Sequence, residues 1–171
     1  GCGKLGVSPT DMLAEIESVA LCLSKGLGAP AGAVLAGSKE MIRKAHRIRK
    51  LVGGGMRQIG VLAAAGIYAL DHHIDRLADD HANALRLAEG LQKIPQLDVS
   101  PDEAQTNMVF VGVPEGSSLA LQAHLLKRGI LNNRHEPTIR LATHPDSGRD
   151  GVALLAAGAR AFFARIVRSS L

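Results

Sequence analysis

The stretch Cys22-Leu23-Ser24-Lys25-Gly26-Leu27-Gly28-Ala29-Pro30 ends an apolar run with a lysine and places two glycines soon after it. The preceding residues 19–23 are apolar enough for a buried strand, so we predict strands over residues 18–24 and 33–36, separated by this glycine-rich turn. A lysine at the end of a buried strand usually extends its amine to water or pairs with a carboxylate. The alternative is a Schiff-base lysine, whose amine is kept uncharged by burial and attacks an aldehyde, with Gly26 and Gly28 letting backbone pass close to a cofactor.

The composition is that of a globular chain, because 46% of its 171 residues are hydrophobic and 21% are charged. Two cysteines make no disulfide framework, and no apolar run approaches the roughly 18 residues that span a bilayer, so we expect a cytoplasmic protein without a membrane partner. Much of the net charge of +4 lies in residues 43–50, where no aromatic residue could stack on a base. We therefore expect a solvated helix face and no nucleic-acid partner. The chain begins Gly-Cys-Gly without an initiator Met, which predicts a fragment or a processed product.

Three helices are predicted in the first half of the chain. Ser38 is suited to cap a helix that runs through Ile48 and ends at the three glycines of residues 53–55. A second helix is expected from about Met56, and its alanine-rich residues 61–70 should pack deeply. Asp71 is expected to cap a third, connecting helix, whose apolar face would be formed by Ile74, Leu77, Ala78, His81, Leu85 and Ala88.

The second half of the chain predicts a small α/β lobe. We expect strands over residues 106–113, 130–132 and 138–143, a helix over 119–128 closed by Gly129, and a final alanine-rich helix over about 150–168.

Two further groups could bind anions. If Gly53, Gly54 and Gly55 open a helix, their N–H groups could form a cup for a phosphate, with Lys50 and Arg57 beside it; the alternative is a flexible connection. Arg140 interrupts a β-branched strand, where it either lies on an edge strand in water or holds a substrate carboxylate.

Residues 71–81 contain several histidines and aspartates, which raises the question of a metal site. The adjacent His72 and His73 would point about 100° apart on a helix, and Asp75 and Asp79 would lie on its polar face. We interpret these residues as caps and solvated charges and predict no metal site.

Six motifs occur in a characteristic order and spacing, and together they cover about residues 18–145: SKGLGAP, VLAGSKEMIRKAHRIRK, GGGMRQIGVLAAAGIYAL, RLADDHANALRLAEGL, QTNMVFV and IRLATH. With these motifs the chain resembles the low-specificity L-threonine aldolases, which are pyridoxal-phosphate enzymes of fold type I, the α/β fold of aspartate aminotransferase. The resemblance implies cleavage of L-threonine or L-allo-threonine to glycine and acetaldehyde.

The resemblance also assigns roles to four residues. Lys25 matches the catalytic lysine that holds the pyridoxal phosphate, and Lys50 matches a lysine near the active site. Arg57 matches the arginine that reaches the cofactor phosphate of a neighbouring subunit, which implies a homo-oligomer, a tetramer or dimer of dimers in the intact protein. Arg140 matches the arginine that binds the substrate carboxylate.

The chain departs from the family mildly at Ile48 and Ala33, where relatives often have an aromatic residue and a serine. More importantly, the family's N-terminal half supplies a histidine that stacks on the cofactor ring and a DGAR-type motif, and no match to that motif occurs here. The resemblance thus implies that residues 1–75 end the large cofactor-binding domain and that 76–171 form a linking helix and the small domain. We expect this chain alone to be inactive. The alternatives are a non-catalytic homologue that retains only the oligomer interface, or another fold-type-I amino-acid lyase.

Overall fold

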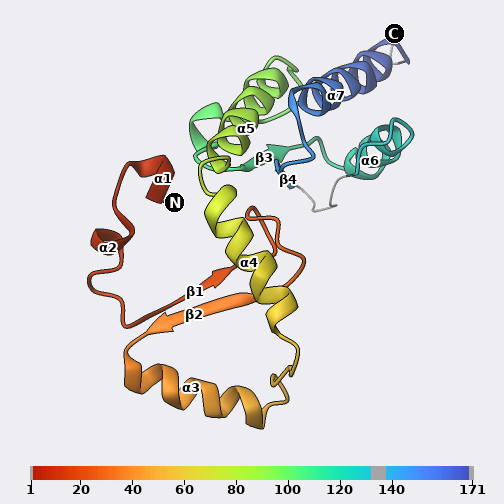
Figure 1. Cartoon of the computed structure of the whole chain (residues 1–171). Coiled ribbons are helices and arrows are strands. Elements are labelled where there is room, and N and C mark those ends of the chain that lie inside the picture. Colours follow the sequence, from red (N-terminus) through yellow and green to blue (C-terminus); the bar gives the residue numbers. More distant parts are fainter. Residues whose placement is uncertain (1, 132–137, 170–171) are drawn as a thin grey trace. The chain divides into compact units, whose positions relative to one another are not determined.

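The chain divides into two compact units, residues 1–77 and 78–171, here called the N-terminal and C-terminal units (Figure 1). The structure is a computed structural model that describes residues 2–131 and 138–169. Each unit is described by itself.

The N-terminal unit contains a β-hairpin and two long helices. Its elements are α1 (Cys2–Leu5), α2 (Pro9–Met12), β1 (Ser18–Cys22), β2 (Ala33–Gly37), α3 (Lys39–Leu51) and α4 (Gly60–His72). The two strands are antiparallel, with Ser18 opposite Gly37 and Cys22 opposite Ala33. Figure 1 shows α4, in yellow, beside the end of the hairpin where the connecting loop lies. Both predicted strands are thereby confirmed, whereas α1 and α2 lie where the sequence predicted no element.

The strands of the hairpin are much less buried than the sequence predicted. Every residue of β2 is exposed, and β1 has only two half-buried residues. Within residues 61–70 of α4, only Gly66 and Ala69 are buried, so the predicted deep packing of this helix is wrong for this chain. The physical reason is that a two-stranded hairpin has too few neighbours here to cover both of its faces. The core of the unit is small and consists of Leu23, Leu27, Ala29 and Ala69.

The ends of α3 have clear capping interactions. Ser38 Oγ accepts a hydrogen bond from the Met41 N–H at 3.2 Å, which confirms the predicted N-cap. At the other end Gly53 has φ +83°, and its N–H donates to the Lys50 carbonyl at 3.2 Å. The Gly54 N–H donates to the Arg49 carbonyl at 2.7 Å, which completes a Schellman motif. The glycines therefore end α3, and α4 begins at Gly60 rather than near Met56.

The C-terminal unit combines a two-stranded ladder with three helices. Its elements are α5 (Leu77–Gln92), the 3₁₀ turn η1 (Pro101–Glu103), β3 (Met108–Gly112), α6 (Ser118–Leu126), β4 (Thr138–Ala142) and α7 (Arg149–Ser169). The strands are antiparallel, with Phe110 opposite Arg140. This confirms two of the predicted strands, the helix closed by Gly129, whose φ is +74°, and the final helix. Residues 130–131 are not a strand, and residue 132 lies outside the described residues.

Helix α5 differs from its prediction in both its start and its buried face. Asp71 does not cap it, because α4 continues to His72 and α5 begins at Leu77. Its buried side is formed by Asp80, Asn83, Ala84, Leu87, Ala88 and Leu91. Leu85 and Ile74, which the sequence placed on the apolar face, are 38% and 52% exposed. The later start removes Ile74 from the helix, so the apolar stripe follows a different set of positions.

The C-terminal unit has a continuous hydrophobic core. Val109, Val111, Ile139 and Leu141 on one face of the ladder are buried, and residues of α5, α6 and α7 pack with them in a single cluster. Figure 1 shows these three helices around the ladder, in green to blue. The other face of the ladder, which carries Arg140, remains exposed.

Candidate functional site

Lys25 lies in the loop that joins β1 to β2, and we call residues 23–32 the lysine loop. The Leu23 N–H donates to the Gly32 carbonyl at 3.0 Å, and the Ala29 N–H donates back to the Leu23 carbonyl at 3.0 Å. The Lys25 carbonyl accepts from the Gly28 N–H at 2.8 Å, and Gly28 has φ +74°, a conformation that favours glycine. The Lys25 side chain is exposed, so the prediction of a buried amine is wrong for this chain. The loop is nevertheless compact and internally bonded.

Two side chains after the body of α4 hold this loop through its carbonyl groups. Arg76 Nη2 donates to the Gly26 carbonyl at 2.8 Å. His73 Nδ1 lies 2.6 Å from the Leu27 carbonyl oxygen, and because a carbonyl can only accept, Nδ1 carries the hydrogen. No pattern in the sequence predicts this role for His73 or Arg76. Partners that lie 46 and 50 residues away leave no signal in local spacing.

A thiol lies at the start of the lysine loop. Cys22 is a free cysteine whose Sγ lies 3.5 Å from Ser24 Oγ. Hydrogen bonds from the side chain and backbone of Ser24 hold the pKa of the Cys22 thiol below its ordinary value, and the charge of Lys25 adds to this effect. The end of β1 and the lysine loop therefore carry two nucleophiles, a thiol and an amine, three residues apart.

Lys50 and Arg57 lie on either side of the glycine triplet. Lys50 is exposed in the last turn of α3, and a Cβ at Gly55 would lie 2.8 Å from its Cδ, so Gly55 leaves space for the lysine stem. Arg57 is exposed in the turn before α4. The predicted cup of three glycine N–H groups is wrong, because Gly53 and Gly54 donate to carbonyls of α3. The two basic side chains remain available for an anion.

Lys25 and Arg57 lie near opposite ends of α4. The lysine loop packs on Ala69 and contacts His73, whereas Arg57 precedes the first residue of the helix, Gly60. A helix of 13 residues is about 20 Å long, because each residue rises about 1.5 Å. A single pyridoxal phosphate molecule is much shorter than this. The structure thus brings Lys25 together with His73 and Arg76, and not with Arg57 of the same chain.

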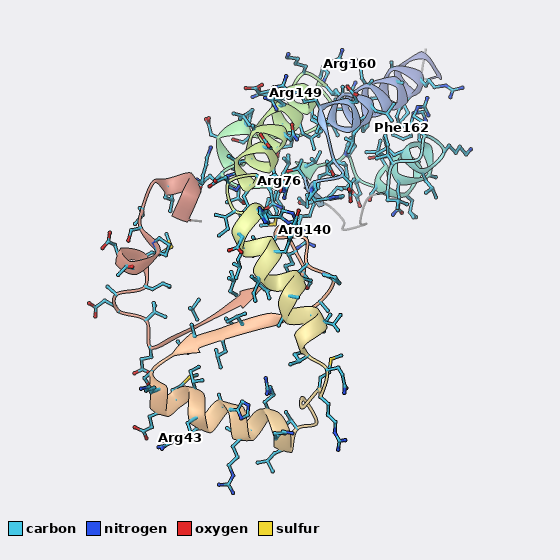
Figure 2. All side chains as sticks on the ribbon, viewed as in Figure 1. Arg43, Arg76, Arg140, Arg149, Arg160 and Phe162 are labelled. Carbon is cyan, nitrogen blue, oxygen red and sulfur yellow. The ribbon has the colours of Figure 1, made fainter. Side chains whose placement is uncertain are left out.

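Arg140 lies at the middle of β4 in the C-terminal unit (Figure 2). It is exposed opposite Phe110, while its neighbours Ile139 and Leu141 point into the core. Among the residues that the structure describes, none forms a hydrogen bond or ion pair with its guanidinium. Arg140 lines a depression of about 630 Å³ together with Thr143, His144, Asp146 and Ser147. Its charge is therefore accessible to an anionic group from solution.

The described residues fit pyridoxal phosphate in their chemistry. The cofactor needs an amine for its aldehyde and cationic or N–H donors for its phosphate, and Lys25, Lys50 and Arg57 present these groups at the surface of the N-terminal unit. Over residues 2–131 and 138–169 no group of three or more His, Cys, Asp or Glu side chains is arranged to hold a metal ion. In the same ranges no helix has the length and apolar character needed to cross a membrane.

Comparison with solved structures defines the class of fold. A crystal structure of a candidate L-allo-threonine aldolase from Listeria monocytogenes EGD-E superposes with a TM-score of 0.76 at 18% identity, covering 94% of this chain and 48% of that one. Serine palmitoyltransferase of Sphingomonas wittichii superposes with a TM-score of 0.73 at 19% identity, covering 89% of this chain and 41% of that one. The fold is that of the fold-type-I pyridoxal-phosphate enzymes, which confirms the α/β class predicted from the sequence.

The sequence comparison identifies the family. The model of the β-eliminating lyase family matches residues 1–114, so the chain belongs to this family. The low-specificity L-threonine aldolase of Escherichia coli (strain K12) is 48% identical over 149 residues, which is 87% of this chain and 44% of that protein. The chain thus spans less than half the length of this relative. Any stretch of 149 residues in a chain of 171 includes residues 23–149, and hence Lys25, Lys50, Arg57 and Arg140.

Proposed function

We propose that the protein is a pyridoxal-phosphate-dependent aldolase that cleaves L-threonine or L-allo-threonine to glycine and acetaldehyde, in threonine catabolism and glycine biosynthesis. The observation that carries this proposal is the 48% identity to a low-specificity L-threonine aldolase over a stretch that includes all four candidate site residues. Because the chain spans 44% of that relative, the activity is proposed for a protein of the relative's full length. This chain by itself is expected to be inactive. A cytoplasmic location is part of the same proposal.

Within that protein we assign residues 1–75 to the end of the large cofactor-binding domain and 76–171 to a linking helix and the small domain. The division of the chain into compact units at residues 77 and 78 supports this assignment. Enzymes of the β-eliminating lyase family and of fold type I depend on pyridoxal phosphate. Lys25 Nζ is the amine that would hold the cofactor's aldehyde, Lys50 would lie near the active site, and Arg57 would neutralise the phosphate of a neighbouring subunit's cofactor.

The roles of the site residues follow from their chemistry. When bound, pyridoxal phosphate accepts the electron pair that is released as the Cα–Cβ bond of the substrate breaks. Arg140 presents a planar guanidinium that binds a carboxylate through two parallel hydrogen bonds. Such a clamp fixes the orientation of the amino acid, so that the bond to be broken is held in one direction. The exposed position of Arg140 on β4 is consistent with this role.

We also propose that the protein is a homo-oligomer, a tetramer or dimer of dimers, in which Arg57 serves the cofactor of a neighbouring subunit. The support is the position of Lys25 and Arg57 near opposite ends of the 13-residue helix α4.

A second candidate function is that of another amino-acid lyase of the same fold. The description of the matching family as β-eliminating lyases favours it, because that name denotes loss of a β-substituent rather than cleavage of a carbon–carbon bond. Both reactions need Lys25 and Arg140, so these residues alone do not separate them.

The experiment that tests the function is a product assay on the protein of full length. We expect glycine and acetaldehyde from L-threonine and L-allo-threonine, and their loss in Lys25→Ala. Arg140→Lys should raise KM, because an ammonium cannot reproduce the bidentate contact. Release of ammonia and a keto acid without acetaldehyde would instead identify a β-eliminating lyase. If Lys25→Ala retains aldol cleavage, the assignment of Lys25 is wrong.

A further inference from the structure

The lysine loop is held from outside by two side chains that the proposed function does not use. We propose that Arg76 and His73 are positioning residues for Lys25, acting through the carbonyl groups of Gly26 and Leu27. This inference rests on the proposed function, because positioning matters only if the Lys25 amine reacts with an aldehyde.

The first argument is the location of the two contacts. Arg76 Nη2 binds the carbonyl of Gly26 at 2.8 Å, and His73 Nδ1 binds the carbonyl of Leu27 at 2.6 Å. These are the first and second peptide carbonyls after Lys25. A hydrogen bond from a guanidinium is charge-assisted and stronger than one between neutral groups. The two contacts fix the peptide planes between Gly26 and Leu27 and between Leu27 and Gly28.

The second argument is the flexibility that these contacts remove. Gly26 and Gly28 flank Leu27, and glycine has more backbone freedom to lose than any other residue. The Lys25 side chain is exposed, and no hydrogen bond or ion pair with another described residue directs it. The direction of the amine is therefore set by the backbone of the loop, and the loop is set by its bonds to Arg76 and His73.

The third argument is the close approach of the packing residues. A Cβ at Gly28 would lie 3.6 Å from His73 Nδ1, and a Cβ at Gly26 would lie 3.0 Å from Leu77 Cδ2. Gly26 therefore allows the loop to lie against Leu77, whereas Gly28 is favoured by its φ of +74° and leaves an ordinary contact to His73. Gly26 and Gly28, which the sequence associated with cofactor access, thus also belong to the part of the loop that contacts His73 and Arg76.

The test substitutes Arg76 and His73 in the protein of full length and compares each substitution with a conservative variant of the same residue. Arg76→Met removes the donor to Gly26, and Arg76→Lys keeps a cation. His73→Phe removes the donor to Leu27, whereas His73→Asn keeps an amide N–H near the position of Nδ1. Arg43→Met is the control, because Arg43 is exposed on the outer side of α3, as Figure 2 shows. Hydrogen exchange of the α3 amides, which lie in the same unit but outside the lysine loop, reports whether each variant has folded.

Two readouts do not depend on turnover. The first is hydrogen exchange of the Gly28 and Ala29 amides, whose bonds close the loop. The second is the share of Lys25 that carries a pyridoxal phosphate adduct after borohydride reduction, determined by peptide mapping and compared with exposed Lys44. We expect Arg76→Met to raise exchange about ten-fold, as expected for loss of one charge-assisted hydrogen bond, and His73→Phe to raise it by a smaller factor of about three. Both should lower the Lys25 adduct several-fold with Lys44 unchanged. Arg76→Lys and His73→Asn should recover part of both signals.

The outcomes separate this inference from the proposed function. One outcome is that Lys25 carries more adduct than Lys44 in the unsubstituted protein and that this preference is the same in Arg76→Met and His73→Phe. The positioning role is then overturned while the proposed function stands. If the parent shows no preference for Lys25 over Lys44, the proposed function is overturned. In that case the positioning role is overturned with it, even if Arg76→Met still loosens the loop, because the contacts would then be structural only.

Discussion

The two units differ in how they use their apolar residues. Among the residues that the structure describes, the core of the C-terminal unit has nineteen buried members, from Ala84 to Phe163, and the core of the N-terminal unit has four. In the N-terminal unit large apolar residues remain at the surface, with Leu51 and Val52 each 77% exposed. Yet three of the four candidate site residues belong to this unit. Most of the candidate site residues thus lie outside the unit that has the larger core.

The two strand pairs show the same difference in local detail. Along β3 and β4 buried and exposed residues alternate, so one face of the ladder is covered. Along β1 and β2 no residue is buried. Both pairs have antiparallel registers of five residues, so the difference comes from what packs on them and not from the strands themselves.

The largest expected effect is the loss of a core leucine from the C-terminal unit. Leu125 is 2% exposed and its neighbour Leu126 is 55% exposed, which gives a matched pair. Leu125→Ala should reduce the free energy of unfolding by about 2–5 kcal/mol through lost transfer energy and a cavity. Leu126→Ala should change it by no more than about 0.5 kcal/mol. Urea unfolding followed by circular dichroism measures both, and equal losses would contradict the assigned core.

A smaller and local effect is expected from the core leucine of the N-terminal unit. Leu23 is 6% exposed, and its Cδ1 would lie 2.9 Å from a Cβ at Gly66. Leu23→Ala should cost about 2 kcal/mol, at the low end for a core leucine, because its cluster is small. Hydrogen exchange should increase in the lysine loop and remain unchanged in the C-terminal unit. Leu21→Ala, at a position 44% exposed, is the control. Loss of protection throughout the C-terminal unit would show that the two units do not unfold separately.

Two glycine substitutions in the N-terminal unit are expected to change the free energy of unfolding in opposite directions. Gly53 has φ +83°, so Gly53→Ala should destabilise the end of α3 by about 1–2 kcal/mol. Gly60 is the first residue of α4, and a Cβ added there would meet no atom within 4 Å, so Gly60→Ala should stabilise that helix by up to about 1 kcal/mol. Thermal unfolding of both variants against the parent measures the difference. The Schellman assignment fails if Gly53→Ala is as stable as Gly60→Ala.

The smallest expected effect is a pH dependence of the C-terminal unit. Burial lowers the pKa of His124 from its ordinary value of 6.5, and the charge of Arg128 adds to this. The folded unit therefore favours neutral His124, and the unfolded chain takes up the proton more readily. The stabilisation is complete above pH 6.5 and is lost as the pH falls below it. His124→Gln should remove this part of the pH dependence in urea unfolding; an unchanged dependence would assign it to other groups.

Local signals in the sequence predicted much of the fold. The cap at Ser38, the closing Gly129 and the strands around Ala20 and Val109 were correct, because each depends on neighbours within a few residues. The glycine triplet was assigned to the wrong helix, since three glycines can either end one helix or begin the next. The burial of β1 and β2 was not predictable, because it depends on which other segments pack on the strands, and the apolar residues of a strand do not indicate those segments.

The candidate site was predicted unevenly for the same reason. Lys25 and Arg140 stood out because a charge interrupts an apolar stretch, and the structure places both at the surface. The contacts of His73 and Arg76 span 46 and 50 residues, and no pattern within a single segment indicates them. Roles that depend on tertiary contacts need coordinates.

The long-range anchors also have a consequence for the order of folding. The β1–β2 hairpin closes a loop of ten residues, which is a fast and local event. The bonds from His73 and Arg76 must wait until the chain has closed loops of 46 and 50 residues and α4 has docked. The segment around Lys25 is thus expected to reach its final conformation later than the strands on either side of it. In a newly synthesised chain the hairpin would thus form before the backbone around Lys25 is held in its final conformation.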